Sequence, residues 1–332
     1  MPSRFALAVL AGAGLAAGAV RSGFKPKPVP VPQLGPDAFP LPEADPPDDM
    51  DVIAVPTGVN HRNALYAYRG GSYFDRRDFY IGAALVKHPQ GDLLLDIGFG
   101  RGIDQQFSTM PKLFQKMTKY SVWRPAVDQL AAAGYDMSRL GAILLTHAHW
   151  DHMSGLPDFP GVRVMVTRRD LESYLNPHMH GRFGPPFSET HFEWDPFDFD
   201  GGPYLGFPRS LDVYGDGSIV CVPSPGHTPG SIVIFVTTAA GLKYAFVGDL
   251  VWQREGLIRR EERPLASQMW ADFDANGTRT NIIKMAQVVA AIPELVVVPA
   301  HDQNAFADLG RLPHVKTDGI TLQNPVDLAK LP

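Results

Sequence analysis

The chain has 332 residues, of which 45% are hydrophobic and 20% are charged, the ordinary balance of a globular protein. This length is sufficient for one large domain or two small ones. The formal net charge is −5 and the sequence contains no basic run. It therefore lacks the basic footprint of nucleic-acid-binding proteins, and we expect no nucleic-acid partner.

Residues 1–23 have the pattern of a targeting segment. Arg4 supplies a positive charge, and an apolar run of 16 residues, rich in alanine and glycine, extends from Phe5 to Val20. Ala17-Gly18-Ala19 has the small-x-small form of a signal-peptidase site. A membrane span needs about 20 residues, so this run is short for one. We therefore expect a signal peptide and a periplasmic or secreted protein; the alternative is an uncleaved anchor in the inner membrane.

Proline dominates residues 24–50. Its fixed φ and its missing N–H exclude a helix or a central strand and favour extended polyproline conformation. We interpret the segment as a spacer, or as an arm that lies on the protein surface. The prolines are Pro26, Pro28, Pro30, Pro32, Pro36, Pro40, Pro42, Pro46 and Pro47.

Residues 51–332 are expected to form one folded domain. Short apolar runs between turn-forming clusters predict strands, and periodic apolar positions predict helices. In a helix over 280–291, Ile282, Met285, Ala286 and Val289 would share one face. Because several strands are joined by short turns, the pattern indicates mixed sheets. The predicted strands are 81–86, 93–97, 142–145, 162–166, 219–222, 231–236, 243–247 and 295–298, and a second helix is predicted over 126–133.

Two residues in this domain have distinctive expected environments. Cys221 is the only cysteine of the chain, so no intrachain disulfide can form. It lies in an apolar run, which predicts a strand position in the core rather than a metal ligand. His88 lies in the turn-forming cluster of residues 88–92, and we expect it to be solvated.

A cluster of metal-ligand residue types follows the strand predicted over 142–145. His147, His149, Asp151 and His152 fall within six positions. The first two share one side of an extended backbone, whereas the adjacent pair Asp151 and His152 diverge if the chain stays extended. Nitrogen and oxygen ligands suit a borderline cation such as zinc. One tight turn could therefore serve two neighbouring metal ions.

Residues 177–207 are rich in glycine, proline and aromatic residues, and we interpret them as a long loop. His178 and His180 have ligand spacing but lack a following Asp-His pair, so they and His191 are not assigned to a metal. Such a loop is often a lid, and we expect a mobile aromatic cover beside the metals. The alternatives are packing over the core and a homodimer contact. The aromatic residues are Phe183, Phe187, Phe192, Trp194, Phe197, Phe199, Tyr204 and Phe207.

Further motifs lie on both sides of the histidine cluster, each beside an apolar run. They are Leu93-Leu94-Leu95-Asp96-Ile97-Gly98, Pro225-Gly226-His227-Thr228-Pro229-Gly230-Ser231, Phe246-Val247-Gly248-Asp249 and Val298-Pro299-Ala300-His301. Together with the cluster they resemble, in order, the His-x-His-x-Asp-His signature and later ligand motifs of the metallo-β-lactamase superfamily. The likeness covers about residues 51–302. It implies an αββα sandwich of two mixed sheets flanked by helices, with metals at one edge.

The resemblance also implies a ligand set for two divalent ions, with zinc expected. His147, His149 and His227 would bind one ion, whereas Asp151, His152 and His301 would bind the other. Asp249 would bridge them, because two close cations need anionic ligands. Asp96 belongs to an Asp-x-Gly turn, so we expect it to support the structure or to bond to a ligand histidine rather than to touch a metal.

Within this superfamily, the ligand set resembles N-acyl homoserine lactonases and glyoxalase II-type thioester hydrolases best. The stretch 81–91, leading into 93–98, fits the lactonases slightly better. The diiron flavoproteins of the superfamily carry glutamate where this chain has His149, which argues against redox chemistry. Lactonases usually carry a tyrosine three positions after the bridging aspartate. Here that residue is Trp252, whose indole donates one hydrogen bond but is not a phenolic acid.

The resemblance implies a hydrolase of a small ester, lactone or thioester. A hydroxide bridging the metals would attack the carbonyl, and Asp151 could carry a proton to the leaving group. Asp151 and Asp249 are therefore the expected catalytic residues. A metal-binding protein without turnover is the alternative from another class, and the sequence leaves both membrane attachment through the N-terminus and a homodimer open.

Overall fold

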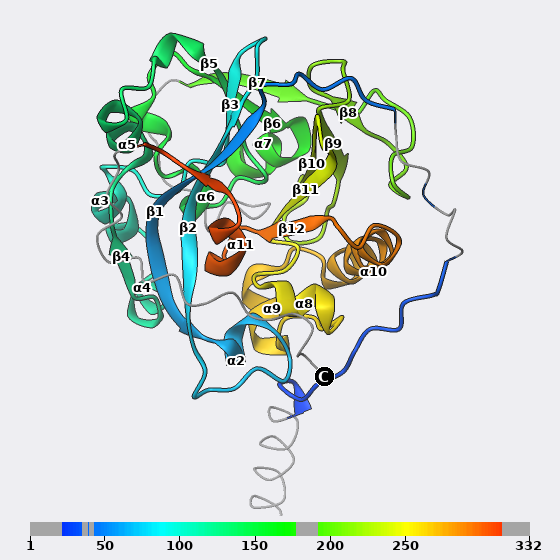
Figure 1. The fold of residues 1–332 in the computed structure, drawn as a ribbon. Coiled ribbons are helices and arrows are strands. Elements are labelled where there is room, and N and C mark those ends of the chain that lie inside the picture. The colour runs from blue at the N-terminus through cyan, green and yellow to red at the C-terminus, as the bar shows by residue number, and fades with distance from the viewer. Residues whose placement is uncertain (1–21, 35–38, 40–42, 177–191, 314–332) are drawn as a thin grey trace, which may run out of the picture.

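Two β-sheets lie face to face in the computed structural model, which describes residues 22–34, 39, 43–176 and 192–313 (Figure 1). The first sheet mixes parallel and antiparallel neighbours, and β4 pairs with β1 beside the main strand order. The second sheet is antiparallel except for one parallel pair at its edge. In spatial order the first sheet is β13 (Gly310–Arg311), β1 (Asp51–Asn63), β2 (Arg76–Lys87), β3 (Asp92–Leu95), β5 (Leu140–Leu144), β6 (Arg163–Thr167) and β7 (Glu193–Phe197), with β4 at Tyr120–Val122. The second is β12 (Val296–Pro299), β11 (Gly241–Gly248), β10 (Ile232–Thr238), β9 (Ile219–Pro223) and β8 (Leu211–Asp212).

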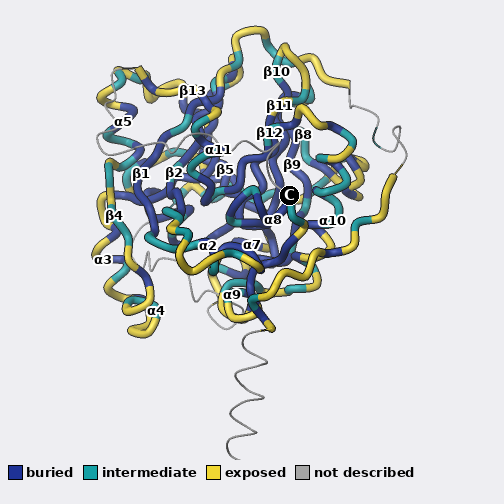
Figure 2. The backbone as a smooth tube through the Cα atoms, turned by 60° about the horizontal axis from the view of Figure 1, so that its bottom comes forward, coloured by how far each residue is buried: buried dark blue, intermediate teal, exposed yellow. Residues whose placement is uncertain are grey.

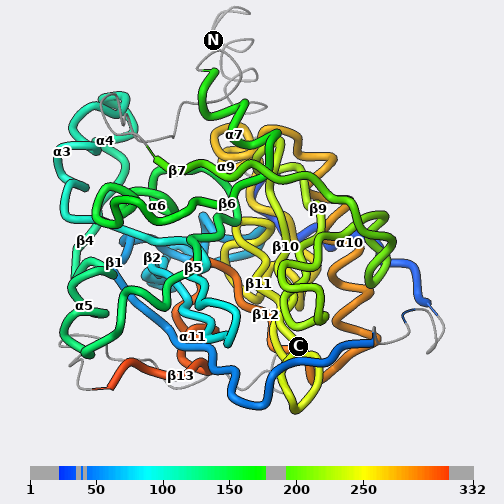
Figure 3. Tube along the Cα trace, turned by 90° about the horizontal axis from the view of Figure 1, so that it is seen from above, coloured from blue at the N-terminus to red at the C-terminus, as the bar shows by residue number. Residues whose placement is uncertain are grey.

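Helices cover the outer faces of both sheets, while the strands between them are mostly buried (Figure 2). Viewed from above, α5 lies outside the first sheet and α10 outside the second (Figure 3). The predicted αββα sandwich of two mixed sheets is therefore confirmed. The helices are α2 (Ala64–Ala67), α3 (Ile103–Ser108), α4 (Lys112–Met117), α5 (Ala126–Ala132), α6 (Trp150–Met153), α7 (Arg168–Leu175), α8 (Arg254–Ile258), α9 (Leu265–Ala271), α10 (Ala275–Ala291) and α11 (Gln303–Ala307).

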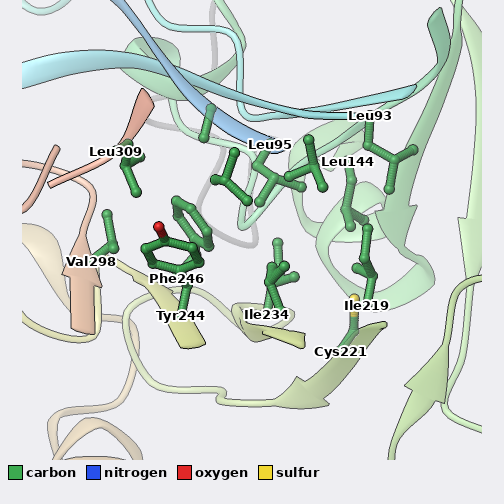
Figure 4. Packing of buried hydrophobic residues seen from close by; sticks show 14 of the residues in the cluster. Leu93, Leu95, Leu144, Ile219, Cys221, Ile234, Tyr244, Phe246, Val298 and Leu309 are labelled. Atoms are coloured by element: carbon green, nitrogen blue, oxygen red, sulfur yellow. The ribbon is translucent and has the colours of Figure 1, made fainter. Parts of the chain in front are cut away.

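Alternation along the strands separates the three apolar layers. In β10, Ile234 faces the first sheet, whereas Val233 and Phe235 face the outer layer under α10. In β5, Leu144 faces the second sheet and Ile143 faces the helices outside the first. Successive side chains of a strand point to opposite faces, so a strand covered on both faces contributes to two apolar layers. Figure 4 shows the layer between the sheets, where Leu93, Leu95 and Leu144 of the first sheet meet Ile219, Cys221, Ile234 and Phe246 of the second.

Each predicted strand and helix overlaps an observed one, with ends shifted by a few residues. The fully buried apolar residues of α10 are Ile282, Met285 and Val288; the predicted Val289 is partly buried and packs against the same layer, and Ala286 is partly buried. Strand β1 gave a weak signal because Pro56 and Gly58 interrupt its apolar pattern at a shift of register.

Cys221 lies in β9 within the layer between the sheets, as predicted. Burial raises the pKa of its thiol. The expectation for His88 was wrong, because its side chain is buried. Its Nε2 lies 3.0 Å from a carboxylate oxygen of Asp216, and its ring stacks on Tyr214 with the centroids 3.8 Å apart. A partner distant in sequence thus compensates for the lost solvation.

The expected aromatic cover was wrong for residues 192–207. Residues 193–197 form β7, which pairs with β6, and Phe197 and Phe199 pack against the layer between the sheets. Tyr204 and Phe207 are buried in the outer layer of the second sheet. Long-range packing therefore absorbs aromatic residues that local sequence could not place. Residues 177–191, with His178, His180, His191, Phe183 and Phe187, lie outside the described residues.

The described part of the proline-rich segment lies against the domain. The Val29 side chain is buried, and its backbone N–H donates to the carbonyl of Arg260 at 2.7 Å. The Lys27 N–H donates to the carboxylate of Glu261 at 2.9 Å. Among the residues that the structure describes, none of the helices is both long and apolar enough to cross a membrane.

We predict that Ile234→Ala lowers the free energy of unfolding by about 2–5 kcal/mol, because it leaves a cavity between the sheets. Urea denaturation followed by circular dichroism measures the loss. Ile258→Ala on α8 is the matched control, since Ile258 is 41% exposed and its truncation should change stability little. Equal losses at both positions would contradict the assigned core.

Candidate metal centre

The predicted ligands lie where four strands end at one edge of the sandwich. Strands β9 and β11 both run antiparallel to β10, and β12 is parallel to β11, so these three end at the same edge of the second sheet. His227 follows β9, Asp249 follows β11, and His301 follows β12. The cluster His147 to His152 follows β5 of the first sheet. The ends of such strands are the usual position of sites in layered α/β folds.

Within the cluster, the backbone changes from extended to helical at His149. This residue has φ −93° and ψ 158° and caps α6, so Asp151 and His152 lie in a helical turn rather than in an extended chain. Successive helical residues are about 100° apart around the axis. The side chains of Asp151 and His152 therefore point in different directions, as predicted, but they do so from a helical turn.

Three imidazoles form the first group. The Nδ1 atom of His149 lies 3.1 Å from Nε2 of His147 and 2.9 Å from Nε2 of His227. One ring nitrogen from each therefore points to a common point, and the three rings lie edge to face with centroids 4.6–4.7 Å apart. This is a donor set that suits zinc.

The second group joins the helical turn to the end of β12. The Nε2 atom of His152 lies 4.0 Å from Oδ1 of Asp151, and Nε2 of His301 lies 3.6 Å from Oδ2 of the same carboxylate. The three residues could hold one cation. The Asp151 side chain is the most exposed of the three, so this group is reached from solvent at Asp151.

Asp249 lies between the two groups. Its Oδ2 is 3.2 Å from Nε2 of His227, whereas its Oδ1 is 3.1 Å from Nε2 of His301 and 3.4 Å from Nε2 of His152. Both Oδ1 of Asp249 and Nε2 of His152 are buried without a hydrogen-bond partner. Buried polar atoms without partners are rare, and here they point into the same space. The structure thus brings all seven predicted residues together in an arrangement that fits cations.

The pKa shifts differ between the two groups around the Asp249 anion. Burial would lower the pKa values of His152 and His301, but Asp96 and Asp249 hold that of His152 well above its usual range, and Asp249 with Asp151 raises that of His301. Burial and neighbouring histidines hold the pKa values of His147 and His149 well below their usual range, which leaves lone pairs available. Burial would raise the pKa of Asp249, but His301, His227 and His152 outweigh it and hold that pKa far below its usual value. Asp249 is therefore ionised.

Two ligand histidines, His152 and His301, have a partner on the far side of the ring that fixes its orientation. Asp96 accepts from the Thr146 backbone N–H at 2.7 Å and lies 2.8 Å from Nδ1 of His152. The predicted support of a ligand histidine by Asp96 is therefore present in the structure. Nδ1 of His301 lies 2.8 Å from the carbonyl oxygen of Tyr80. Such outer contacts orient the imidazoles.

Sequence reasoning missed two further carboxylates. Asp170, in the first turn of α7, accepts backbone N–H bonds from Ala148 and Gly230 and so ties the first sheet's ligand loop to the second's. Asp272 follows α9 and lies 3.3 Å from Nδ1 of His227. Neither belongs to a recognisable motif. The position of Asp170 near a helix start indicates capping, which gave no reason to link it to the site.

Trp252 also contacts the centre. Its Nε1 donates to Oδ2 of Asp249 at 2.7 Å. Phe79 lies beside the indole with centroids 5.6 Å apart, and the guanidinium of Arg263 lies 4.6 Å from the centre of its ring. Arg263 also bonds to Asp272 at 2.6 Å. A continuous set of contacts therefore links the central carboxylate to the outer partner of His227.

The sequence model of the metallo-beta-lactamase superfamily matches residues 77–301 of this chain, a range that contains all seven predicted ligands and their partners described above. The chain belongs to this superfamily. It is a metal-dependent hydrolase related to lactonases.

Curated relatives include a probable metallo-hydrolase of Mycobacterium tuberculosis, Rv2300c, which is 29% identical over 67% of this chain and 74% of its own length. The N-acyl homoserine lactonase AttM of Agrobacterium fabrum is 24% identical over 56% of this chain and 67% of its own length. Both matches agree with the hydrolase class and with the resemblance to lactonases inferred from the motifs.

Solved structures of lactonases have the same fold. An N-acyl homoserine lactone hydrolase with bound N-hexanoyl-L-homoserine has a TM-score of 0.61 at 17% identity, covering 79% of this chain and 97% of that chain. The dizinc quorum-quenching lactonase AidC has a TM-score of 0.52 at 16% identity, covering 78% and 90%. At these identities the likeness concerns the fold alone.

We predict that Asp96→Asn weakens metal retention roughly 10–100-fold, because the amide no longer supplies an anionic acceptor to His152. Competition between the protein and a chromophoric chelator for zinc measures the affinity. The control is Asp128→Asn on α5, whose carboxylate pairs with Arg101 at the surface. Unchanged affinity in Asp96→Asn, with the fold retained by circular dichroism, would exclude the supporting role.

Proposed function

We propose that this protein is a dinuclear hydrolase, with zinc as the expected metal, that cleaves the ester bond of a lactone or related ester with an apolar substituent. The observation that supports two ions is the position of Asp249. Its two oxygens face different histidine groups, His227 on one side and His152 with His301 on the other. A carboxylate in that position can neutralise part of the charge of two cations.

The chain supplies the rest of the reaction geometry. When bound, a pair of divalent ions supplies an activated water and polarises the substrate carbonyl. Asp151 is the carboxylate that reaches the solvent side, where its Oδ2 can hold a proton and pass it to the departing oxygen. Asp249 is buried and bonded to Trp252, so it keeps the ligands in place rather than exchanging protons.

A pocket beside His149 and His227 supports an apolar substituent. Its walls come from α7, α9 and the residues after α9, and it encloses about 90 Å³. That is well below the roughly 300–1,000 Å³ of pockets that enclose a drug-sized ligand. A substrate would therefore be only partly enclosed, and a longer chain would extend across the rim. The apolar wall residues are Tyr174, Met269, Trp270 and Phe273.

Trp252 makes this centre different from the lactonases that it resembles. Lactonases place a tyrosine at this point of the motif, but the single indole donor of Trp252 already bonds to Asp249. The indole is therefore occupied in holding the bridging carboxylate and is not free to donate to a substrate carbonyl. We infer that substrates depend here on the pocket wall more than on a side-chain donor.

We predict that purified protein holds about two divalent ions per chain and that Asp249→Asn loses one ion and most activity. The neutral amide cannot balance two cations. Elemental analysis measures the ions, and hydrolysis of a short aryl ester measures activity. Asp274→Asn is the control, because Asp274 is an exposed cap of α10 and asparagine also caps helices. A single tight ion in fully active protein would refute the dinuclear centre.

We also predict that Phe273→Ala raises KM for long-chain lactones about tenfold, and less for short ones. Losing about 50 Å² of apolar contact costs roughly 1.3 kcal/mol, close to a factor of ten. The panel should contain N-acyl homoserine lactones, γ-lactones, γ-lactams and thioesters. Phe74→Ala is the matched control, since Phe74 is exposed and lies outside the pocket. Preference for thioesters, or equal effects at all chain lengths, would count against the proposed substrate class.

A further inference from the structure

Exposed apolar side chains gather on one face of the domain, around α2, α9 and the start of β2. Phe74 is 93% exposed, Met269 85% and Tyr73 62%. Large exposed apolar groups of this kind mark interaction surfaces when they are contiguous. We call this set the apolar face; it consists of Tyr66, Tyr73, Phe74, Leu265, Met269 and Trp270.

Contacts between its segments show that the apolar face is contiguous: the Leu65 N–H of α2 donates to the carbonyl of Ser72 at 3.2 Å, which holds the chain of Tyr73 and Phe74 beside α2. The Ser267 hydroxyl of α9 donates to the carbonyl of Tyr66 in α2 at 3.2 Å. The ring centroids of Tyr73 and Phe74 lie 5.7 Å apart. In Figure 2 the exposed chain around α2 and α9 lies on the same side of the molecule. The two sequence-distant segments therefore form one surface.

The first described residues are fastened to this same face. The Leu265 N–H donates to the carbonyl of Gly23 at 3.3 Å, and the Gly70 N–H donates to that of Phe24 at 2.8 Å. The guanidinium of Arg69 donates to the carbonyls of Ser22 and Lys25, both at 3.0 Å. Residues 22–25 are therefore part of the folded surface and do not act as a free spacer.

This attachment leaves almost no slack before the N-terminal apolar run. The run from Phe5 to Val20 ends two positions before Ser22, with Arg21 between them. An extended chain covers at most about 3.6 Å per residue, so Ser22 lies within roughly 7 Å of the end of the run. If the run is inserted in a bilayer, the face around Ser22 must lie at the headgroups.

The chemistry of the face suits that position. Tyrosine and tryptophan favour the interface between apolar tails and water, and Tyr73 and Trp270 supply both. Basic residues next to an apolar run attract anionic headgroups. Lys25 and Lys27 are exposed beside the attachment point.

We propose that the apolar face docks on the surface of an anionic phospholipid bilayer, with the apolar run from Phe5 to Val20 retained as an anchor. The run joined to this face favours a bilayer over a second copy of the chain as the occupant. Met269 and Trp270 also line the pocket that contains His149 and His227. Docking therefore puts the mouth of the pocket at the membrane interface, where a lipophilic ester or lactone would concentrate; this last consequence rests on the proposed function.

Fluorescence quenching tests the docking without any turnover. The full chain is reconstituted in vesicles of phosphatidylethanolamine and phosphatidylglycerol, with or without lipids that carry a doxyl quencher near the headgroup. Intact mass confirms that the N-terminal run is present. The difference between the wild type and Trp270→Phe reports Trp270. We expect doxyl lipids to remove most of this emission, and Trp123→Phe, on the chain after β4, to leave the quenching unchanged.

Variants that keep the anchor separate docking from tethering. Phe74→Glu combined with Leu265→Glu should abolish the quenching of Trp270, because both charges would face the headgroups. Phe74→Glu alone is the second variant; Phe74 is almost fully exposed, so folding should be unaffected. Quenching that persists in both variants, an unquenched wild type, or a self-associated chain whose Trp270 is shielded from lipid would overturn the proposal.

Activity is measured separately with a short, water-soluble ester. The Phe74→Glu variants should retain this activity, because neither Phe74 nor Leu265 lines the pocket. They should lose rate on a long-chain lactone presented in vesicles. Loss of quenching without loss of short-ester activity would thus be specific to docking, whereas a chain that docks but cleaves no ester would refute only the proposed function.

Discussion

The position of the ionised Asp249 carboxylate within a ring of buried imidazoles is the constraint on which the catalytic edge depends. In this weakly polarisable space, electrostatic interactions are stronger than in water, so small displacements of the donors have large effects. Four strands converge to place the groups, and their hydrogen-bonded pairing prevents each loop from relaxing independently. The sandwich therefore acts as a rigid frame for a concentration of polar groups that the loops could not hold alone.

Two buried carboxylates extend this frame beyond the ligands. Asp96 joins the end of β3 to Thr146 and His152, and it does so with φ at 54°, a left-handed conformation that costs about 1–2 kcal/mol for most residues. Asp170 joins Ala148 to Gly230 across the two sheets. Both sites satisfy backbone donors that would otherwise be buried without partners. The strained backbone of Asp96 and the burial of both carboxylates cost free energy, but these contacts fix the relative positions of the ligand-bearing loops.

Sequence alone was sufficient for the fold and for the list of residues that converge on the edge. Continuous apolar runs predict the central strands, because burial on both faces requires apolar side chains at successive positions, as in β10. The apolar pattern is weak in β1, where Pro56 and Gly58 interrupt it. The environment of His88 was predicted wrongly because its partner Asp216 is remote in sequence. The aromatic residues after position 192 were also misplaced because the residues against which they pack are remote in sequence. Residue type indicates that a side chain needs a partner, but only the folded chain determines which partner it finds.

The bond between Trp252 and Asp249 could not be predicted either, since an indole three positions after an aspartate has many possible directions. Its direction is set by Phe79 and Arg263, which are distant from each other in sequence. The same is true of Asp272, which reaches His227 only because α9 folds over the edge. Outer contacts of this kind depend on tertiary packing and are the part of a site that motifs describe least well.

The burial of Cys221 between the sheets has a practical consequence for thiol chemistry. The thiolate is the reactive form, and burial both raises the pKa of this thiol and excludes reagents from it. In the folded protein the native sulfur should therefore be silent toward maleimides and mild oxidants. A cysteine introduced at an exposed position would be labelled selectively in the otherwise unaltered chain, and modification of Cys221 itself would report opening of the sandwich.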